Sequence, residues 1–143
     1  MAYATYQDVI DEFKNIDTTN GRITNAKITT WISQAEAYID GRLSLLYTTP
    51  ITGTNSLLIV QQISIGLVAQ RVARILETKS ITPKGDQYIP KDLIKDAEAK
   101  LKLIVERKLK LSDAEEISEG AGVKSYSSSN TVERVFKQGV EQW

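Results

Sequence analysis

The most constraining feature of this sequence is a long segment, from Asn55 or Ser56 to about Thr78, whose apolar residues fall in every direction on a helical wheel. They are Leu57, Leu58, Ile59, Val60, Ile63, Ile65, Leu67, Val68, Val72, Ile75 and Leu76. A helix that is apolar all round is buried. Pro50, Gly53 and several polar residues interrupt the surrounding uncharged stretch well short of the ~20 apolar residues that a membrane span requires. The sequence therefore predicts a central helix that other helices cover.

Small residues form a narrow strip along this predicted helix, at Gly66, Ala69 and Ala73. A glycine inside a helix costs about 1 kcal/mol relative to alanine. We expect close packing of another helix to compensate for that cost, because small side chains let two backbones approach one another.

Three other segments show the three-to-four spacing of apolar residues that is typical of amphipathic helices. The first runs from Tyr6 to Lys14, after a capping-box-like pair formed by Thr5 and Asp8. The second runs from Asn25 to Leu46 and the third from Lys91 to Leu111. Together with the central helix, they predict an all-α fold, a small four-helix bundle with an extended C-terminal arm.

The composition changes after Leu111, where acidic residues are followed by a Gly- and Ser-rich stretch. Such a stretch buries too little apolar surface to order itself. We therefore divide the chain into a helical domain, residues 1–111, and a C-terminal arm, residues 112–143. We expect deletion of residues 113–143 to leave the helices folded.

The arm closes with a short group of apolar residues that we expect to bind a neighbouring protein chain. Large apolar side chains dominate such interfaces, and the candidates here are Val132, Val135, Phe136, Val140 and Trp143. Two alternatives stay open. The arm packs on its own domain, or residues 123–135 pair as a strand or hairpin.

Charge and composition narrow the classes of function. Eighteen basic and eighteen acidic residues give a formal charge of zero, which argues against a non-specific nucleic-acid binder. The chain has no cysteine and no histidine, which excludes cysteine nucleophiles, Cys/His zinc sites and Ser-His-Asp triads. We therefore expect no enzyme, and we assign no catalytic, metal-binding or cofactor-binding residue. A small enzyme or regulatory subunit that uses the space between the second and third helices stays open as an alternative.

The fourth predicted helix is rich in lysine and suggests a second alternative, a small helical nucleic-acid-binding module. Lys91, Lys95 and Lys102 align on one side of it, but Glu98 and Glu106 share that side. Mixed signs at this spacing are typical of intrahelical ion pairs, worth about 0.3–0.5 kcal/mol each. The charge pattern therefore favours a solvent-exposed face on this helix over a surface that binds in a nucleic-acid groove.

Two short stretches resemble a known family. Ile39-Asp40-Gly41-Arg42-Leu43, followed by Tyr47, Pro50 and the apolar helix, resembles the head–tail adaptor (connector) proteins of tailed bacteriophages. The opening Tyr6-Gln7-Asp8-Val9-Ile10 is similar to the start of the Mu-like branch of that family. The resemblance covers roughly Tyr3 to Leu111, and the arm matches no pattern of the family.

The resemblance implies a structural virion protein of the phage neck that is assembled in the host cytoplasm. Such adaptors form rings, usually dodecamers, which dock under the portal protein and present a surface to a head-closure or tail-completion protein. DNA passes through the lumen without specific binding, and no membrane is involved. The arm then reaches the portal or a neighbouring subunit. Possible contacts between subunits are Pro50 and the two leucines that lie off the apolar face of the fourth helix, Leu103 and Leu109, which we expect to be exposed.

Overall fold

The computed structural model describes residues 2–13, 16, 18–19, 21–79 and 89–117. Within these ranges the chain forms four helices and no strand: α1 (Tyr6–Asp11), α2 (Asn25–Leu43), α3 (Thr54–Lys79) and α4 (Lys91–Val105). The predicted all-α class is confirmed. The arm residues 118–143, including the strand or hairpin alternative and all five proposed anchors, lie outside the described residues.

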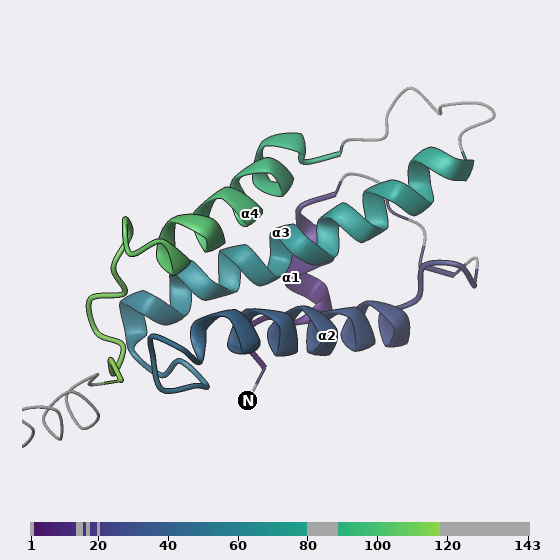
Figure 1. The fold of residues 1–143 in the computed structure, drawn as a ribbon. Helices are drawn as coiled ribbons and strands as arrows, with labels where there is room; N and C mark the ends of the chain where they lie inside the picture. Colours follow the sequence, from purple (N-terminus) through teal and green to yellow (C-terminus); the bar gives the residue numbers. More distant parts are fainter. Residues whose placement is uncertain (1, 14–15, 17, 20, 80–88, 118–143) are drawn as a thin grey trace, which may run out of the picture.

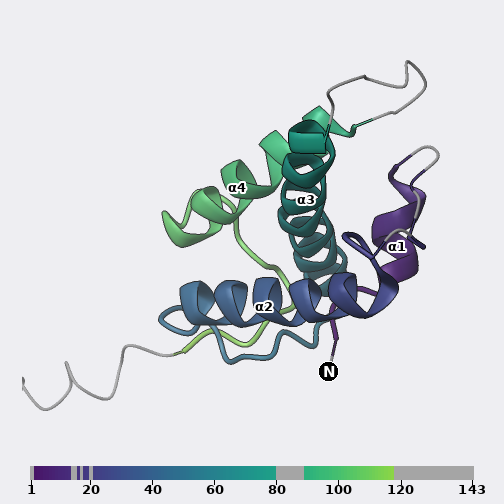
Figure 2. The ribbon, with the colours of Figure 1, turned by 90° about the vertical axis from the view of Figure 1, so that its right-hand side faces the viewer.

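Helix α3 runs through the middle of the molecule, and the other helices lie around it (Figure 1). In the end-on view of Figure 2, α4, α2 and α1 occupy three different sides of α3. Helix α4 packs mainly on α3 and much less on α2, whereas α1 contacts both α2 and α3. The central helix expected from the sequence is therefore present.

The core consists of two clusters that share α3. One joins α1, the first half of α2 and the second half of α3, and the other joins the second half of α2, the first half of α3 and the end of α4. By length and composition α3 could also cross a membrane, but more than half of it is buried inside the protein, as in the core helix of a bundle. Leu58 is an exception to the predicted burial, because its side chain is 57% exposed.

Gly66 brings α4 against α3. A Cβ atom added at Gly66 would lie 2.5 Å from the Cβ of Ala97 and 2.8 Å from the carbonyl oxygen of Leu93, both on α4. No real Cβ atom sits so close to such rigid groups, so only glycine permits this approach. The close packing predicted for the strip of small residues is confirmed at this position.

Two helices begin as their sequences predict. At α1 the N–H of Asp8 donates to Thr5 Oγ1 (3.3 Å) and the N–H of Thr5 donates to Asp8 Oδ2 (2.7 Å), which completes a capping box. At α2 the N–H of Lys27 donates to Thr24 Oγ1 (3.2 Å). Helix α2 then ends at Leu43 rather than at the predicted Leu46.

Helix α4 ends at Val105 and not at the predicted Leu111, because Arg107 adopts a left-handed backbone with φ 59°. The N–H of Lys108 donates to the carbonyl of Leu103 (2.9 Å) and the N–H of Arg107 to that of Ile104 (3.0 Å). These two bonds form a Schellman motif, which glycine usually terminates. The turn directs the chain back toward the body and buries Leu111 completely.

The segment after α4 caps the beginning of α3. The N–H groups of Asn55 and Ser56 donate to the two carboxylate oxygens of Asp113 at 2.7 and 2.8 Å, and the Ser56 hydroxyl donates to the same carboxylate. The absence of a side chain at Gly53 leaves room for Asp113 at this position. The Ser56 hydroxyl and the two N–H groups hold the pKa of Asp113 below its usual range, since they stabilise the charged form.

Residues beyond Asp113 run beside the loop that joins α2 to α3. The N–H of Thr48 donates to the carbonyl of Glu115 (2.8 Å), and the N–H of Ile117 donates to that of Leu46 (2.9 Å). The expected boundary between residues 111 and 112 thus falls inside a segment that is attached to the body. Because deletion from residue 113 would remove the cap of α3, we place the start of the removable segment after Ile117.

Tyr3 ties the N-terminal segment to α2 and to the following loop. Its hydroxyl donates to Asp40 Oδ1 and accepts from the N–H of Ile51 (2.9 Å), and its own N–H donates to Glu36. Burial, and then the hydrogen bond to Asp40, raise the pKa of Tyr3 far above its usual range. The tyrosine therefore acts as a neutral, buried connector.

The two helical glycines should respond to alanine in opposite directions. Gly66→Ala should lower the free energy of unfolding by up to about 2 kcal/mol, because an overpacking cost of about 1–3 kcal/mol is offset only in part by the ~1 kcal/mol gained in helix propensity. Gly41→Ala is the control, because an added Cβ there meets nothing within 4 Å, and it should raise stability by about 0.5–1 kcal/mol. Urea denaturation measures both. Equal effects would contradict the close approach at Gly66.

The stabilisation from Asp113 should depend on pH. Because its pKa is lowered by folding, the carboxylate contributes fully above the unfolded pKa, about 3.9. The contribution is lost as the pH falls through the lower folded value. Asp113→Asn should therefore be less stable than the wild type at neutral pH, and the two stabilities should begin to converge only below about pH 4. Glu115→Gln, which removes a neighbouring exposed carboxylate, is the control, and thermal unfolding from pH 2 to 7 is the measurement. A constant difference across that range would be inconsistent with the cap.

Candidate interaction surface

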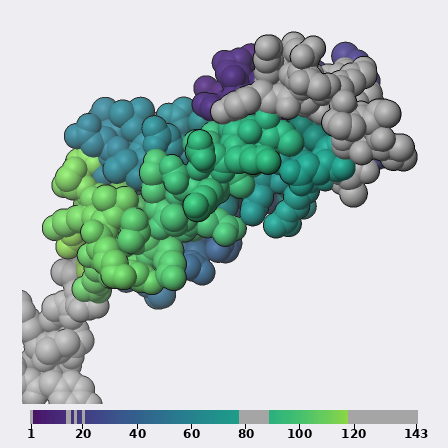
Figure 3. All heavy atoms as spheres, turned by 90° about the horizontal axis from the view of Figure 1, so that it is seen from above, coloured from purple at the N-terminus to yellow at the C-terminus, as the bar shows by residue number. Residues whose placement is uncertain are grey.

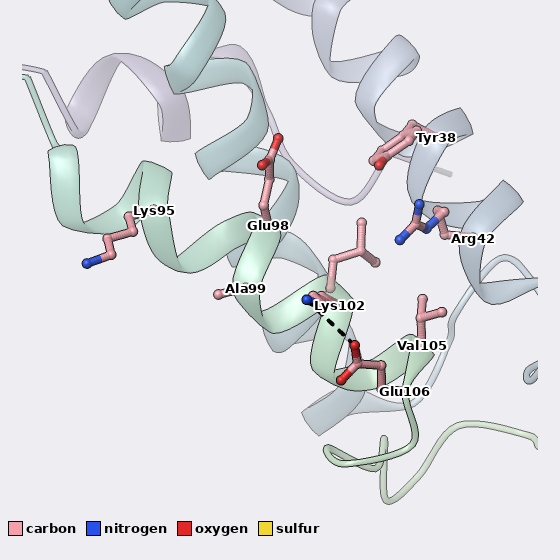
Figure 4. Close-up of a pocket in the computed structure, with 9 residues that line it drawn as sticks. Tyr38, Arg42, Lys95, Glu98, Ala99, Lys102, Val105 and Glu106 are labelled. Carbon is pink, nitrogen blue, oxygen red and sulfur yellow. Dashed lines mark ion pairs between the residues drawn. The ribbon is translucent and has the colours of Figure 1, made fainter.

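A groove of about 530 Å³ separates α2 from α4. It exists because α4 is held against α3 at Gly66 and makes few contacts with α2. Tyr38 and Arg42 line it from the α2 side (Figure 4). From α4 it is lined by Lys95, Glu98, Ala99, Leu101, Lys102, Val105 and Glu106.

An aromatic and a cationic side chain form the α2 wall of the groove. The Tyr38 side chain is 49% exposed, and the guanidinium carbon of Arg42 lies 5.8 Å from the centre of its ring. Such a cation–π pair is worth about 0.5–1 kcal/mol at an exposed site. Figure 4 shows Arg42 extending from α2 into the space that faces α4. Tyrosine and arginine are also the residue types that most often dominate protein interfaces.

The lining of the groove carries three basic residues and two acidic ones: Arg42, Lys95 and Lys102 against Glu98 and Glu106. Glu106 is held between two lysines, with Lys108 Nζ at 2.7 Å and Lys102 Nζ at 3.7 Å. Lys108, which is the closer of the two, lowers the pKa of Glu106 through a hydrogen bond and its charge. Glu98 is the other acid of the groove. Lys95 makes no ion pair with another described residue, so the rim carries net positive charge together with Arg42.

A smaller depression of about 190 Å³ lies between α2 and α3. The guanidinium carbon of Arg71 is 5.5 Å from the centre of the Trp31 ring, and its Nη1 donates to Gln34. Tyr38 borders both this depression and the groove. Small-molecule sites are usually about 300–1,000 Å³. This depression alone is smaller than such a site.

Two exposed leucines lie on another side of the molecule, along the seam between α3 and α4. Lys100 Nζ donates to Gln62 Oε1 (3.2 Å), which aligns these two antiparallel helices. Leu58 precedes Gln62 by one helical turn and Leu103 follows Lys100 by one, so the two leucines share this face. Leu103 is 39% exposed. Figure 3 shows the start of α3 and the end of α4 side by side at the surface.

The three possible inter-subunit residues have different environments. Pro50 is exposed in the loop between α2 and α3, after a cis peptide bond with Thr49. Leu103 is exposed, as expected. The expected exposure of Leu109 is wrong, because it is half-buried against the second core cluster once the chain turns at Arg107.

The groove was not predicted from the sequence. Trp31, Tyr38 and Leu45 recur every seven residues beside the core face of α2, and such a stripe indicates a second packing face. The half-buried Trp31 and the exposed Tyr38 and Leu45 lie on that stripe. This spacing was visible in the sequence, but it could not reveal that α4 leaves these residues uncovered.

Comparison with known proteins does not place the chain in a family. No family model matches it, and no curated protein matches its sequence significantly. Within the described residues, no group of three His, Cys, Asp or Glu side chains is arranged to hold a metal ion.

The residues from Ile39 to Tyr47 connect separate parts of the fold. Ile39 and Leu43 are fully buried, and Asp40 accepts a hydrogen bond from the Tyr3 hydroxyl. Tyr47 is also buried, and its hydroxyl accepts from the N–H of Leu111 (3.2 Å). This stretch therefore joins the N-terminal segment, α2 and the segment that follows α4.

Proposed function

We propose that this chain is a structural subunit of a bacteriophage neck, a head–tail adaptor that forms a ring and docks under the portal protein. The ring, a dodecamer in the usual arrangement, extends the DNA channel and presents a surface to a head-closure or tail-completion protein. The proposal rests first on the sequence resemblance in the stretch from Ile39 to Pro50.

The observation that carries the proposal in the structure is the distribution of exposed side chains. A well-packed core supports two surfaces, the groove with Tyr38 and Arg42 and the seam with Leu58 and Leu103. Exposed aromatic, arginine and leucine side chains on a rigid body suit repeated protein contacts. Repetition around a ring multiplies such contacts into a stable assembly.

The nucleic-acid-binding alternative receives less support from α4. Its Lys102 is paired with Glu106, and Glu98 stands in the same groove as Lys95. A phosphate-binding stripe is expected to be free of acids. Near-neutral net charge suits a channel through which DNA slides.

Imaging of the protein mixed with purified cognate portal protein tests the proposal. We expect a ring stacked coaxially on the portal, and we expect deletion of residues 118–143 to abolish stacking, because the arm anchors Val132, Val135, Phe136, Val140 and Trp143 are then lost. Far-UV circular dichroism and thermal unfolding of the truncated protein should show an intact helical body, because Asp113 and its cap on α3 remain.

The neck proposal would be rejected if no ring formed on the portal. DNA binding that weakens steeply with salt would then favour the nucleic-acid module. Normal stacking of the truncated protein would leave the neck proposal standing and reject only the role of the arm.

A further inference from the structure

Next to the groove, α4 has a second exposed side, which carries acidic residues where the groove carries an excess of basic ones. Asp92, Asp96 and Leu103 are spaced four and seven residues apart, so they fall on one side of the helix. All three are exposed. Lys100 also lies toward this side, where it donates to Gln62 on α3. We call this surface, with Leu58 of α3, the acidic flank.

The groove and the acidic flank are complementary in charge. The groove carries Arg42, Lys95 and Lys102 against Glu98 and Glu106, which leaves an excess of positive charge around Tyr38. The flank exposes its two leucines beside two aspartates. Complementary charges suppress wrong partners and fix the register of an interface. The centre of an interface is more apolar than its rim.

We infer that the acidic flank of one copy of this chain docks in the α2–α4 groove of a second copy. This inference rests on the proposed function, which requires contacts between identical subunits, and it names the surfaces that make them. Leu103 lies against Tyr38 of the next copy, and Asp92 and Asp96 face its Arg42 and lysines.

The contact joins two different surfaces, so it is heterologous. Every copy in a row then has one groove filled and one flank docked, and the row closes into a ring when the rotation between copies permits. An isologous contact, in which the same surface meets itself, would instead stop at a dimer. This difference makes the inference testable with two defective variants.

The first variant, Tyr38→Ala with Arg42→Glu, disables the groove but keeps the flank. The second, Asp96→Lys with Leu103→Lys, disables the flank but keeps the groove. Each should weaken self-association by roughly 30-fold or more, the effect of losing a hot-spot residue. Tyr6→Lys on α1 is the matched control, since Tyr6 is 40% exposed against 39% for Leu103, and it should assemble like the wild type.

Mass photometry and sedimentation of the full-length chain provide the readout, with circular dichroism to confirm that each variant is folded. The wild type should form higher oligomers and each variant should stay monomeric. An equimolar mixture of the two should form a one-to-one dimer and nothing larger, because only one intact groove and one intact flank remain to meet.

Three results would overturn the inference: a wild-type chain that stays monomeric, a flank variant that assembles normally, or a mixture that fails to pair. The neck proposal is judged separately by stacking on the portal. Oligomers that follow the expected pattern without binding a portal would keep this contact and reject the neck. If the chain stacks on the portal and neither variant affects its assembly, the neck proposal stands and this contact is rejected.

Discussion

The close approach of α4 to α3 at Gly66 determines where the surface of this protein is open. The Cβ of Ala97 and the Leu93 carbonyl lie where a side chain at residue 66 would begin, so α4 is held on one side of the central helix. Helix α4 contacts α2 much less than it contacts α3, and Tyr38 and Arg42 stay exposed beside the groove between α2 and α4.

A second set of contacts holds the loops and the terminal segments against the helices. Tyr3, Tyr47 and Asp113 each join segments that are far apart in the sequence, through one hydroxyl or carboxylate with partners on other elements. The two tyrosine hydroxyls are hydrogen-bonded, so the burial of these residues costs little, and the exposed Asp113 carboxylate caps α3. Two of these contacts involve residues between Ile39 and Tyr47: Asp40 accepts from the Tyr3 hydroxyl, and the Tyr47 hydroxyl accepts from the N–H of Leu111.

Periodicity and capping residues were sufficient to predict the helices and the central place of α3. The capping box at Thr5 and the packing at Gly66 were also predictable, because each depends on residues close in the chain or on one small side chain. The end of α4 was not predictable, since Arg107 occupies a position where glycine would have been the signal. The cap formed by Asp113 and the groove both depend on contacts between residues far apart in the sequence, which produce no periodic pattern. The burial predicted for Leu58 was wrong, because a helix that is apolar on all sides does not show which side its neighbours leave uncovered.

The side chains around the groove and the flank should become buried when copies of this chain assemble. Oxidative footprinting compares the solvent accessibility of individual side chains in the monomer and in the assembled ring. We expect strong protection of Tyr38, Leu58 and Leu103 in the ring, with Tyr6 oxidised equally in both states. Equal oxidation of Tyr38 and Leu103 in both states, or protection confined to Tyr6, would contradict it.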